Sequence, residues 1–299
     1  MNFQRLPHLL AVVVTAGIAT SASAQSDYQR TGNQPALLDP FEHSAYFEVG
    51  VFHRSETVLG VDTATTFLPM RIGAEVLAMR HLQIRSQFGI AGATVKTSSA
   101  LGDTRDRAFH PGNLLLGGFY TFGNAESGPD EAEWTLGAGG AVALPTSQNP
   151  DPDQAAAHIG AQRVHGVEDR WLFMPETLTI VPGVYGRLAF GPLFANLDLD
   201  MGFAIPTDDS DPTHTLQVRA EAGWRVETDL RLGVGITEVL EVGGDGSGDR
   251  SQAALRVFFR ADLKILTFGT ELVMNLDDPN GWAFDDGYWG VVTRVGLSL

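Results

Sequence analysis

Leu193 to Thr207 reads LFANLDLDMGFAIPT, and apolar side chains occupy every second position of this stretch. The positions between them include Asn196, Asp198 and Asp200. A period of two residues is typical of a β-strand with one apolar and one polar face. The pattern fits a soluble sandwich, with leucines in a core. It also fits a membrane barrel, with leucines toward lipid and aspartates toward a lumen.

The first 24 residues have the organisation of a secretory signal peptide. An apolar run from Leu9 to Ile18 follows Arg5 and precedes the small residues ASA at positions 22–24. This order predicts export and cleavage after position 24, whereas a membrane anchor needs a longer apolar run. Residues 25–43 are polar without a clear period, and we interpret them as a periplasmic lead-in, either flexible or plug-like.

The composition limits the compartment and the partners. The formal net charge is −16, there is no cysteine, and among 20 basic residues only Lys96 and Lys264 are lysines. An acidic chain repels nucleic-acid phosphate, so we expect no nucleic acid as a partner. Without cysteine there is neither a disulfide framework nor a thiolate metal site. With the signal peptide, these features place the expected location beyond the inner membrane.

Residues 44–299 contain a series of alternating segments that we interpret as one all-β domain. Each segment has about the ten-residue length of a tilted membrane-spanning strand. The twelve expected strands lie near 44–54, 66–77, 81–94, 113–123, 133–145, 177–190, 193–206, 215–226, 230–239, 252–263, 265–276 and 288–299.

The connections between these segments alternate in length. Short links occur at residues 78–80, 191–192, 227–229 and near Lys264, with 124–131 a longer link on the same side. The others are long and polar, such as KTSSALGDTRDRAFHPG at 96–112 and EVGGDGSGDR at 241–250. Tight turns at one end and long loops at the other are typical of an outer-membrane barrel. An even strand number places both termini on the periplasmic, short-turn side.

The two phases of the expected strands differ in charge. One phase is apolar and free of Asp, Glu, Lys and Arg, as a lipid-facing surface requires. Most strand glycines share the other phase, where small residues relieve crowding inside a closed barrel. We therefore predict a twelve-stranded antiparallel transmembrane β-barrel in the outer membrane, surrounded by its lipids. The predicted lumen-lining residues are Glu48, Arg71, Glu75, Arg85, Arg187, Asn196, Asp198, Asp200, Arg219, Glu221, Arg225, Arg256, Arg260, Glu271 and Arg294.

Hairpin geometry predicts two contacts inside this lumen. With a tight turn at 191–192, Arg187 falls opposite or diagonal to Asn196 and Asp198. With a turn near Lys264, Arg256 is expected to face Glu271.

Two segments resemble a known family. GNLLLGGFYTFG at 112–123 and LGAGGAVALPTS at 136–147 look like the meta-pathway phenol-degradation outer-membrane proteins. The resemblance implies a transport-type barrel for small apolar or aromatic compounds, although the usual Gly-Asp of that family is Gly112-Asn113 here. The final stretch, YWGVVTRVGLSL at 288–299, resembles the C-terminal strand recognised by the outer-membrane assembly machinery.

Other classes of function remain alternatives. His53-Arg54-Ser55 resembles the His-x-Ser pair of outer-membrane phospholipases and lipid A deacylases, which implies a lipid-modifying enzyme. A serine nucleophile also requires a group that orients the histidine and an oxyanion hole, and the sequence identifies neither. A closed structural or binding barrel with acidic surface loops is a second alternative. The leading hypothesis is a passive channel or transporter for a small solute.

The loops offer weaker candidates for a metal site. DQAAAHIGAQRVHG at 153–166 predicts a short helix that brings His158 near His165, or that folds inward and narrows the pore. The acidic groups at 208–211 and 245–249 are of the ligand type that Ca²⁺ prefers. We interpret both groups as solvated loops, and expect no catalytic residue, metal or cofactor.

Overall fold

The computed structural model describes residues 44–58, 61–79, 81–99, 102–125, 132–151, 154–155, 157, 160–161, 170–208, 211–227, 230–242, 251–263, 265–276 and 287–298. The expected signal peptide and lead-in, together spanning residues 1–43, lie outside the described residues.

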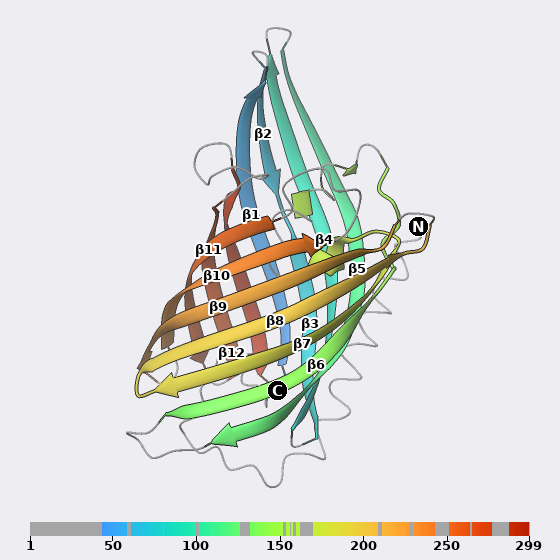
Figure 1. Ribbon diagram of the computed structural model, residues 1–299. Helices are drawn as coiled ribbons and strands as arrows, with labels where there is room; N and C mark the ends of the chain where they lie inside the picture. Colours follow the sequence, from blue (N-terminus) through green and yellow to red (C-terminus); the bar gives the residue numbers. More distant parts are fainter. Residues whose placement is uncertain are drawn as a thin grey trace.

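The described chain forms one closed antiparallel sheet (Figure 1). From β4 to β13 each strand pairs with its neighbours in sequence, and β1 closes the barrel by pairing with β13 from Ser44↔Ser298 to His53↔Trp289. The strands are β1 (Ser44–Val58), β2 (Val61–Phe67), β3 (Met70–Met79), β4 (Leu82–Ser99), β5 (Gly102–Ala125), β6 (Glu133–Leu144), β7 (Thr177–Phe190), β8 (Leu193–Pro206), β9 (Thr213–Glu227), β10 (Leu230–Val242), β11 (Ser251–Leu263), β12 (Leu266–Asn275) and β13 (Trp289–Ser298).

β2 and β3 lie end to end and together occupy one strand position around the barrel, with a break at Leu68 and Pro69. We call each such position around the barrel a stave. Both pair with β1 on one side and with β4 on the other. Pro69 has no N–H to donate, but its carbonyl accepts a hydrogen bond of 2.8 Å from the N–H of Gly50. Leu68 and Gly92 exchange backbone bonds of 2.7 and 3.1 Å. The barrel therefore has twelve staves, which confirms the expected twelve-stranded fold.

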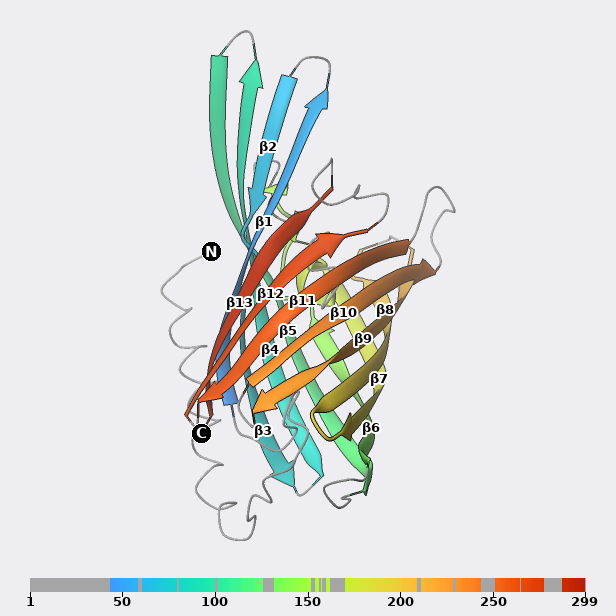
Figure 2. The same cartoon turned by 90° about the vertical axis from the view of Figure 1, so that its left-hand side faces the viewer.

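The prediction of a long loop at 96–112 was wrong. β4 continues to Ser99 and β5 begins at Gly102, so most of this stretch forms a hairpin that projects beyond the barrel (Figure 2). β1 and β2 continue beside it, with Asp62↔Ser98 as the outermost pair between β2 and β4. Above a membrane, water solvates both faces of a sheet, so strands there need no apolar face. For this reason an apolar pattern underestimates their length.

The opposite end of the barrel has short turns, as expected. At the β7–β8 turn Gly191 has φ +55°, a conformation that side-chain-bearing residues rarely adopt. β13 ends at the same end of the barrel (Figure 2). The boundaries of β6 to β13 agree with the sequence-based strands within three residues.

The outer surface has a band of exposed apolar side chains. Leu197 and Val234 are 46% and 52% exposed, and the aromatic residues Tyr120 and Trp224 near the short turns are 51% and 53% exposed. A barrel in a membrane has such a band on its outer surface, where the apolar side chains contact lipid acyl chains and not water. No helix among the described residues is long and apolar enough to span a membrane.

The outward phase of β8 can be tested with a charge. Leu199 lies near the middle of β8 (Leu193–Pro206), and Leu193 lies at its short-turn end. We expect Leu199→Arg to lower the free energy of unfolding by about 2–4 kcal/mol, because it places a charge in the hydrocarbon. The matched variant Leu193→Arg should lower it by about 0–1 kcal/mol, because the interface is hydrated. Urea titration of the barrel in lipid vesicles measures both, and equal losses would contradict the orientation.

Candidate functional site

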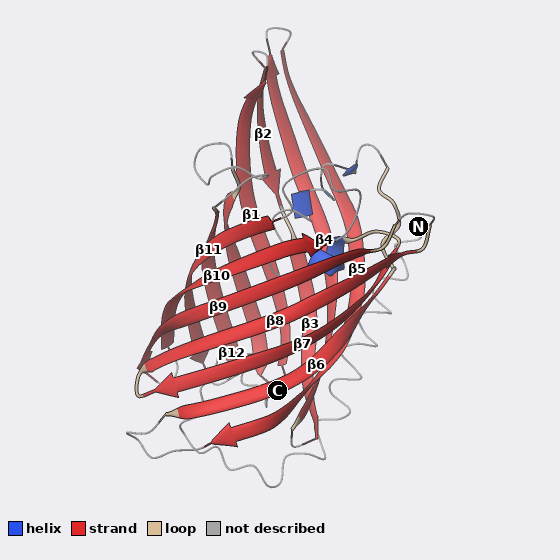
Figure 3. Ribbon diagram, in the orientation of Figure 1, coloured by secondary structure: helices blue, strands red, loops and turns tan. Residues whose placement is uncertain are grey.

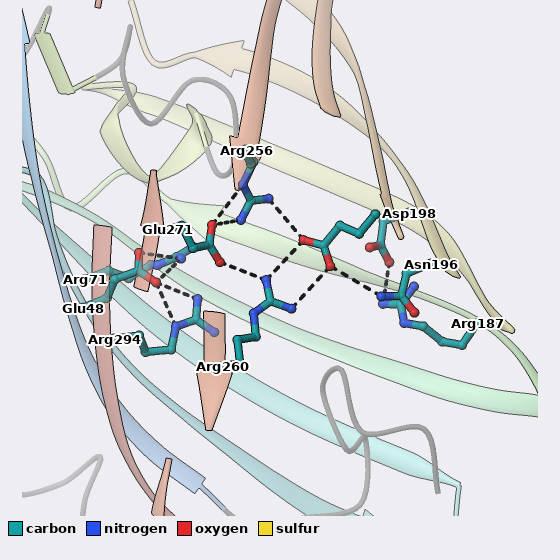
Figure 4. Close-up of polar contacts among 10 residues, drawn as sticks. Glu48, Arg71, Arg187, Asn196, Asp198, Arg256, Arg260, Glu271 and Arg294 are labelled. Atoms are coloured by element: carbon teal, nitrogen blue, oxygen red, sulfur yellow. Dashed lines mark hydrogen bonds and ion pairs between the residues drawn. The ribbon is translucent and has the colours of Figure 1, made fainter. Parts of the chain in front are cut away.

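Glu48 joins three staves inside the barrel. Arg71 of β3 donates two hydrogen bonds to its carboxylate, of 2.6 and 2.8 Å. Arg294 of β13 donates to the same carboxylate at 2.8 Å through Nε (Figure 4). The side chains of Glu48 and Arg71 are each only 3% exposed. Because β1 and β13 are the first and last strands, this cluster lies across the seam that closes the barrel.

A second cluster occupies the interior side of β9, β11 and β12 (Figure 4). The carboxylate of Glu221 lies 3.4 Å from Arg256 and 3.2 Å from Arg260. Both arginines also bind Glu271, Arg260 at 2.9 Å. The pairs alternate in sign around the cluster, so each buried charge has an opposite charge beside it, as buried ions require.

β7 and β8 contribute a third group. Arg187 lies directly opposite Asn196 in the strand register and donates a hydrogen bond of 2.7 Å to the diagonal Asp198. Asn196 in turn donates to Glu221 at 3.4 Å, which connects this pair to the second cluster. The geometry expected for this hairpin is present.

In the β11–β12 hairpin, Arg256 and Glu271 are diagonal neighbours and not directly opposed. Arg256 lies directly opposite Val273, and Glu271 is its diagonal neighbour. The two charged side chains meet nevertheless, with Arg256 Nε donating to Glu271 at 3.0 Å. Long side chains reach diagonal positions across a strand pair, so the ion pair forms without direct opposition.

The other residues predicted to line the lumen differ in their contacts. Arg85 lies opposite Glu75 in the register, yet its guanidinium stacks 4.6 Å above the Phe119 ring, while Gln83 donates to Glu75 at 2.9 Å. Arg219 lies directly opposite Asp198. Positions for the last two come from the register alone: Asp200 opposite Gln217, and Arg225 opposite Arg231.

A segment between β6 and β7 folds into the barrel. Ala155, Ala157, Gly160 and Ala161 are helical, and residues 170–173 form a short 3-10 helix, η2 (Arg170–Phe173). Figure 3 shows these helices in blue beside β4 and β5. Ala157 and Ala161 are completely buried, as are the three apolar residues of η2 to within 1%. The inward fold that the sequence left as an alternative is therefore the one adopted.

Lumen glycines provide the space for η2. A Cβ atom at Gly89 of β4 would lie 3.0 Å from Phe173, and one at Gly202 of β8 would lie 3.1 Å from Trp171. Arg170 forms an ion pair of 2.9 Å with Glu241 of β10. The segment thus reaches staves on separate parts of the wall and occupies the interior between them.

Asn113 anchors this segment to β5. Its amide donates to the carbonyls of Trp171 and Met174 at 3.0 and 2.5 Å, and its carbonyl accepts the N–H of Ser147 at 3.0 Å. His110 adds contacts of 3.0 Å to the Ser147 hydroxyl and 2.8 Å to the Gln148 carbonyl. The Gly-Asn pair at 112–113, which departs from the family pattern, therefore holds both ends of the inward segment.

The sequence-based predictions did not include Asn113, His110, η2 or the ion pair between Arg231 and Asp262. For η2 a signal was present, since Trp171, Leu172 and Phe173 form an apolar run inside a long polar connection. His110 lies in the stretch at 96–112 that was expected to be a loop, and Asn113 is the first residue of the expected strand at 113–123, where the alternating pattern gives no sign of a side-chain anchor.

The contacts of the histidine and serine residues that lie near each other do not form a catalytic arrangement for the enzyme alternative. His53 lies on the outer surface against Trp289, with ring centroids 6.2 Å apart, and Ser55 is exposed near it. Ser147 and His110 do touch, but Ser147 is completely buried. The 2.8 Å contact of His110 Nε2 with the Gln148 carbonyl requires a proton on Nε2, so that nitrogen is a donor and not a base.

Among the described residues no group of three or more His, Asp or Glu side chains could hold a metal ion. The histidines at 158 and 165 and the acidic residues at 209 and 245–249 lie outside the described part of the chain.

Comparison with solved structures identifies the architecture. An outer membrane channel from Pseudomonas putida F1 aligns with a TM-score of 0.53 and 15% identity, over 92% of this chain and 100% of that chain. The chain has the fold of an outer-membrane β-barrel. NanC porin aligns with a TM-score of 0.49 and 9% identity over 85% of this chain and 98% of that chain. LpxR from Salmonella typhimurium aligns with a TM-score of 0.37 and 10% identity, over 85% of this chain and 100% of that chain. No family model and no curated protein sequence matches.

The fold also settles where the barrel resides. A closed antiparallel barrel with an exposed apolar band satisfies all backbone groups within a bilayer, and such barrels are found in outer membranes. The barrel is therefore an outer-membrane protein in contact with lipid, as the sequence indicated.

The seam cluster should be essential for stability. Glu48→Gln removes the negative charge that Arg71 and Arg294 share, although Arg71 remains buried. We expect the free energy of unfolding to fall by about 3 kcal/mol. As a control, Asp262→Asn alters a pair whose acidic side chain is 39% exposed, and should change it by less than about 1 kcal/mol. Urea midpoints in vesicles compare them, and a neutral Glu48→Gln would show that the cluster is dispensable.

Proposed function

We propose that this protein is a passive outer-membrane channel for a small solute, with the fifteen charged and polar positions predicted from the sequence lining its lumen. The solvent accessibility of inward charges supports the proposal. The side chains of Arg294 and Arg260 are 33% and 22% accessible although both project inward from the wall. Accessible charges inside a closed barrel indicate that water occupies the space beside them.

The inward segment would narrow this aqueous path. η2 is held between β5 and β8 by Asn113 and by packing near Gly202. Trp171 and Phe173 are almost completely buried, which places bulky rigid groups within the lumen. Such a constriction would limit the size of a solute, while the ion clusters on the wall would present both signs of charge to it.

Current through single molecules tests the proposal. Purified barrel in planar lipid bilayers should produce discrete current steps, and Trp171→Ala should increase their amplitude because it removes a large side chain from the lumen. The matched variant is Trp224→Ala, which removes the same group from the lipid-facing surface, where Trp224 is 53% exposed. Its steps should equal those of the unaltered protein. Absence of current in all three proteins would overturn the channel proposal.

The burial of the three apolar residues of η2 favours a second candidate, a closed barrel whose loops bind a partner. The same recording separates the two. If neither the natural protein nor Trp171→Ala conducts, and liposomes containing them exclude small sugars and aromatic acids alike, the closed barrel becomes the better account. Swelling of liposomes by a graded series of solutes would instead define the size and class of the permeant.

A further inference from the structure

The outward face of the projecting sheet has a compact group of cations. Lys96 of β4 lies directly opposite Arg105 of β5, and Arg107 is diagonal to Lys96 because it pairs with Thr94. All three side chains are exposed. Directly opposed residues have Cβ atoms about 5 Å apart, and diagonal ones about 7–8 Å apart. Three positive groups therefore lie within reach of one phosphate-sized anion.

These cations have no acidic partner within the described part of the chain. No ion pair or hydrogen bond joins Lys96, Arg105 or Arg107 to another described side chain, whereas the inward arginines of the barrel are mostly paired. Directly opposed like charges destabilise a strand pair. In a chain with net charge −16, three adjacent exposed cations that have no acidic partner among the described side chains offer a place where an external anion can bind.

The acidic residues of the outward face lie on the tip side of the cations. Asp62 and Asp103 are both opposite Ser98, so each is a diagonal neighbour of Lys96, whereas Arg107 lies on the barrel side of Lys96 and Arg105. Asp106 belongs to the other face, because it alternates with Arg105 and Arg107 along β5. The outward face is thus positive near the barrel and negative only toward its tip.

Strand pairing locates the cations relative to the membrane. Within the described chain, β5 pairs with β6 only from Leu114 onward, so Gly102 to Phe109 have a strand partner on one side only. An unpaired strand edge is not tolerated in hydrocarbon, so this part of β5 lies above it. The exposed aromatic residues Phe109 and Tyr120 are eleven positions apart along β5, about the length of a membrane-spanning strand.

From Phe109 toward the tip of the sheet, Arg107 and then Arg105 occupy the next two outward positions of β5. They therefore lie where lipid headgroups begin. The pairs Arg107↔Thr94, Thr94↔Thr66, Thr66↔His53 and His53↔Trp289 form one row across five strands, and a tryptophan is a typical residue of the membrane interface.

We propose that Lys96, Arg105 and Arg107 form a binding site for the phosphorylated headgroup of an outer-leaflet glycolipid. Charge complementarity supports this ligand, and so does the position of the site directly above the apolar band that contacts acyl chains. Phe109, 55% exposed, lies beneath the cations and would contact the same lipid at the base of its headgroup. A basic group at a membrane surface binds anionic headgroups in this manner.

Native mass spectrometry of the detergent-solubilised barrel can measure this binding, with diphosphorylated lipid A as the probe. Each of Lys96→Gln, Arg105→Gln and Arg107→Gln should weaken binding by about five-fold, the usual contribution of one basic residue at an anionic surface. The triple variant should lose it, and Arg107→Lys should retain it. Arg54→Gln is the matched control. Arg54 belongs to the same sheet but points to its inner side, where it donates to the Tyr288 hydroxyl at 3.3 Å.

Three outcomes would overturn the proposal: unchanged binding by the triple variant, equal binding of dephosphorylated lipid A, or binding of inorganic phosphate as tight as that of the lipid. The last outcome would indicate a site for free anions. Heat-modifiable gel mobility confirms that each variant is folded. Planar-bilayer currents should not change in these variants, so the result is independent of the channel proposal.

Discussion

Closure of the hydrogen-bonded ring is the constraint on which the rest of this structure depends. In hydrocarbon every backbone N–H and C=O needs a partner, and pairing of β1 with β13 removes the last unpaired edges. The interruption at Leu68 and Pro69 is compatible with this constraint because the N–H of Gly50 and the backbone of Gly92 bond to those residues. Among the described residues, the projecting sheet has unpaired edges on β1 and β5, where water can solvate them.

Closure also determines the character of the interior. Side chains on the concave face converge, so large groups there must alternate with small ones. Gly89 and Gly202 leave room for η2, and the inward arginines and carboxylates fill the remaining space as ion pairs. The same seam that closes the backbone is also joined by side chains, since Glu48 binds arginines from β3 and β13.

The strands inside the membrane were predictable because lipid imposes a strict period of two on them. β7 and β8 match the expected ranges, and the Arg187–Asp198 contact follows from their tight turn. The upper parts of β4 and β5 were not predictable in this way. Lys96 to Gly112 contains no apolar alternation, because both faces of the projecting sheet meet water. Asn113 gave no signal either, since its partners are carbonyls of residues 58 and 61 positions away.

By itself, the sequence determined the fold class, the staves, the lipid-facing phase and the residues on the inward phase, because alternation and turn length are local properties. Which inward charges meet was decided by the tertiary structure. Arg260 bridges Glu221 and Glu271 from different strands, and such contacts depend on the stagger of the closed ring. The tertiary structure also decided that residues between β6 and β7 enter the lumen, because their anchors lie far away in sequence. The cation group at Lys96, Arg105 and Arg107 exists only through strand pairing, which brings β4 and β5 together above the membrane.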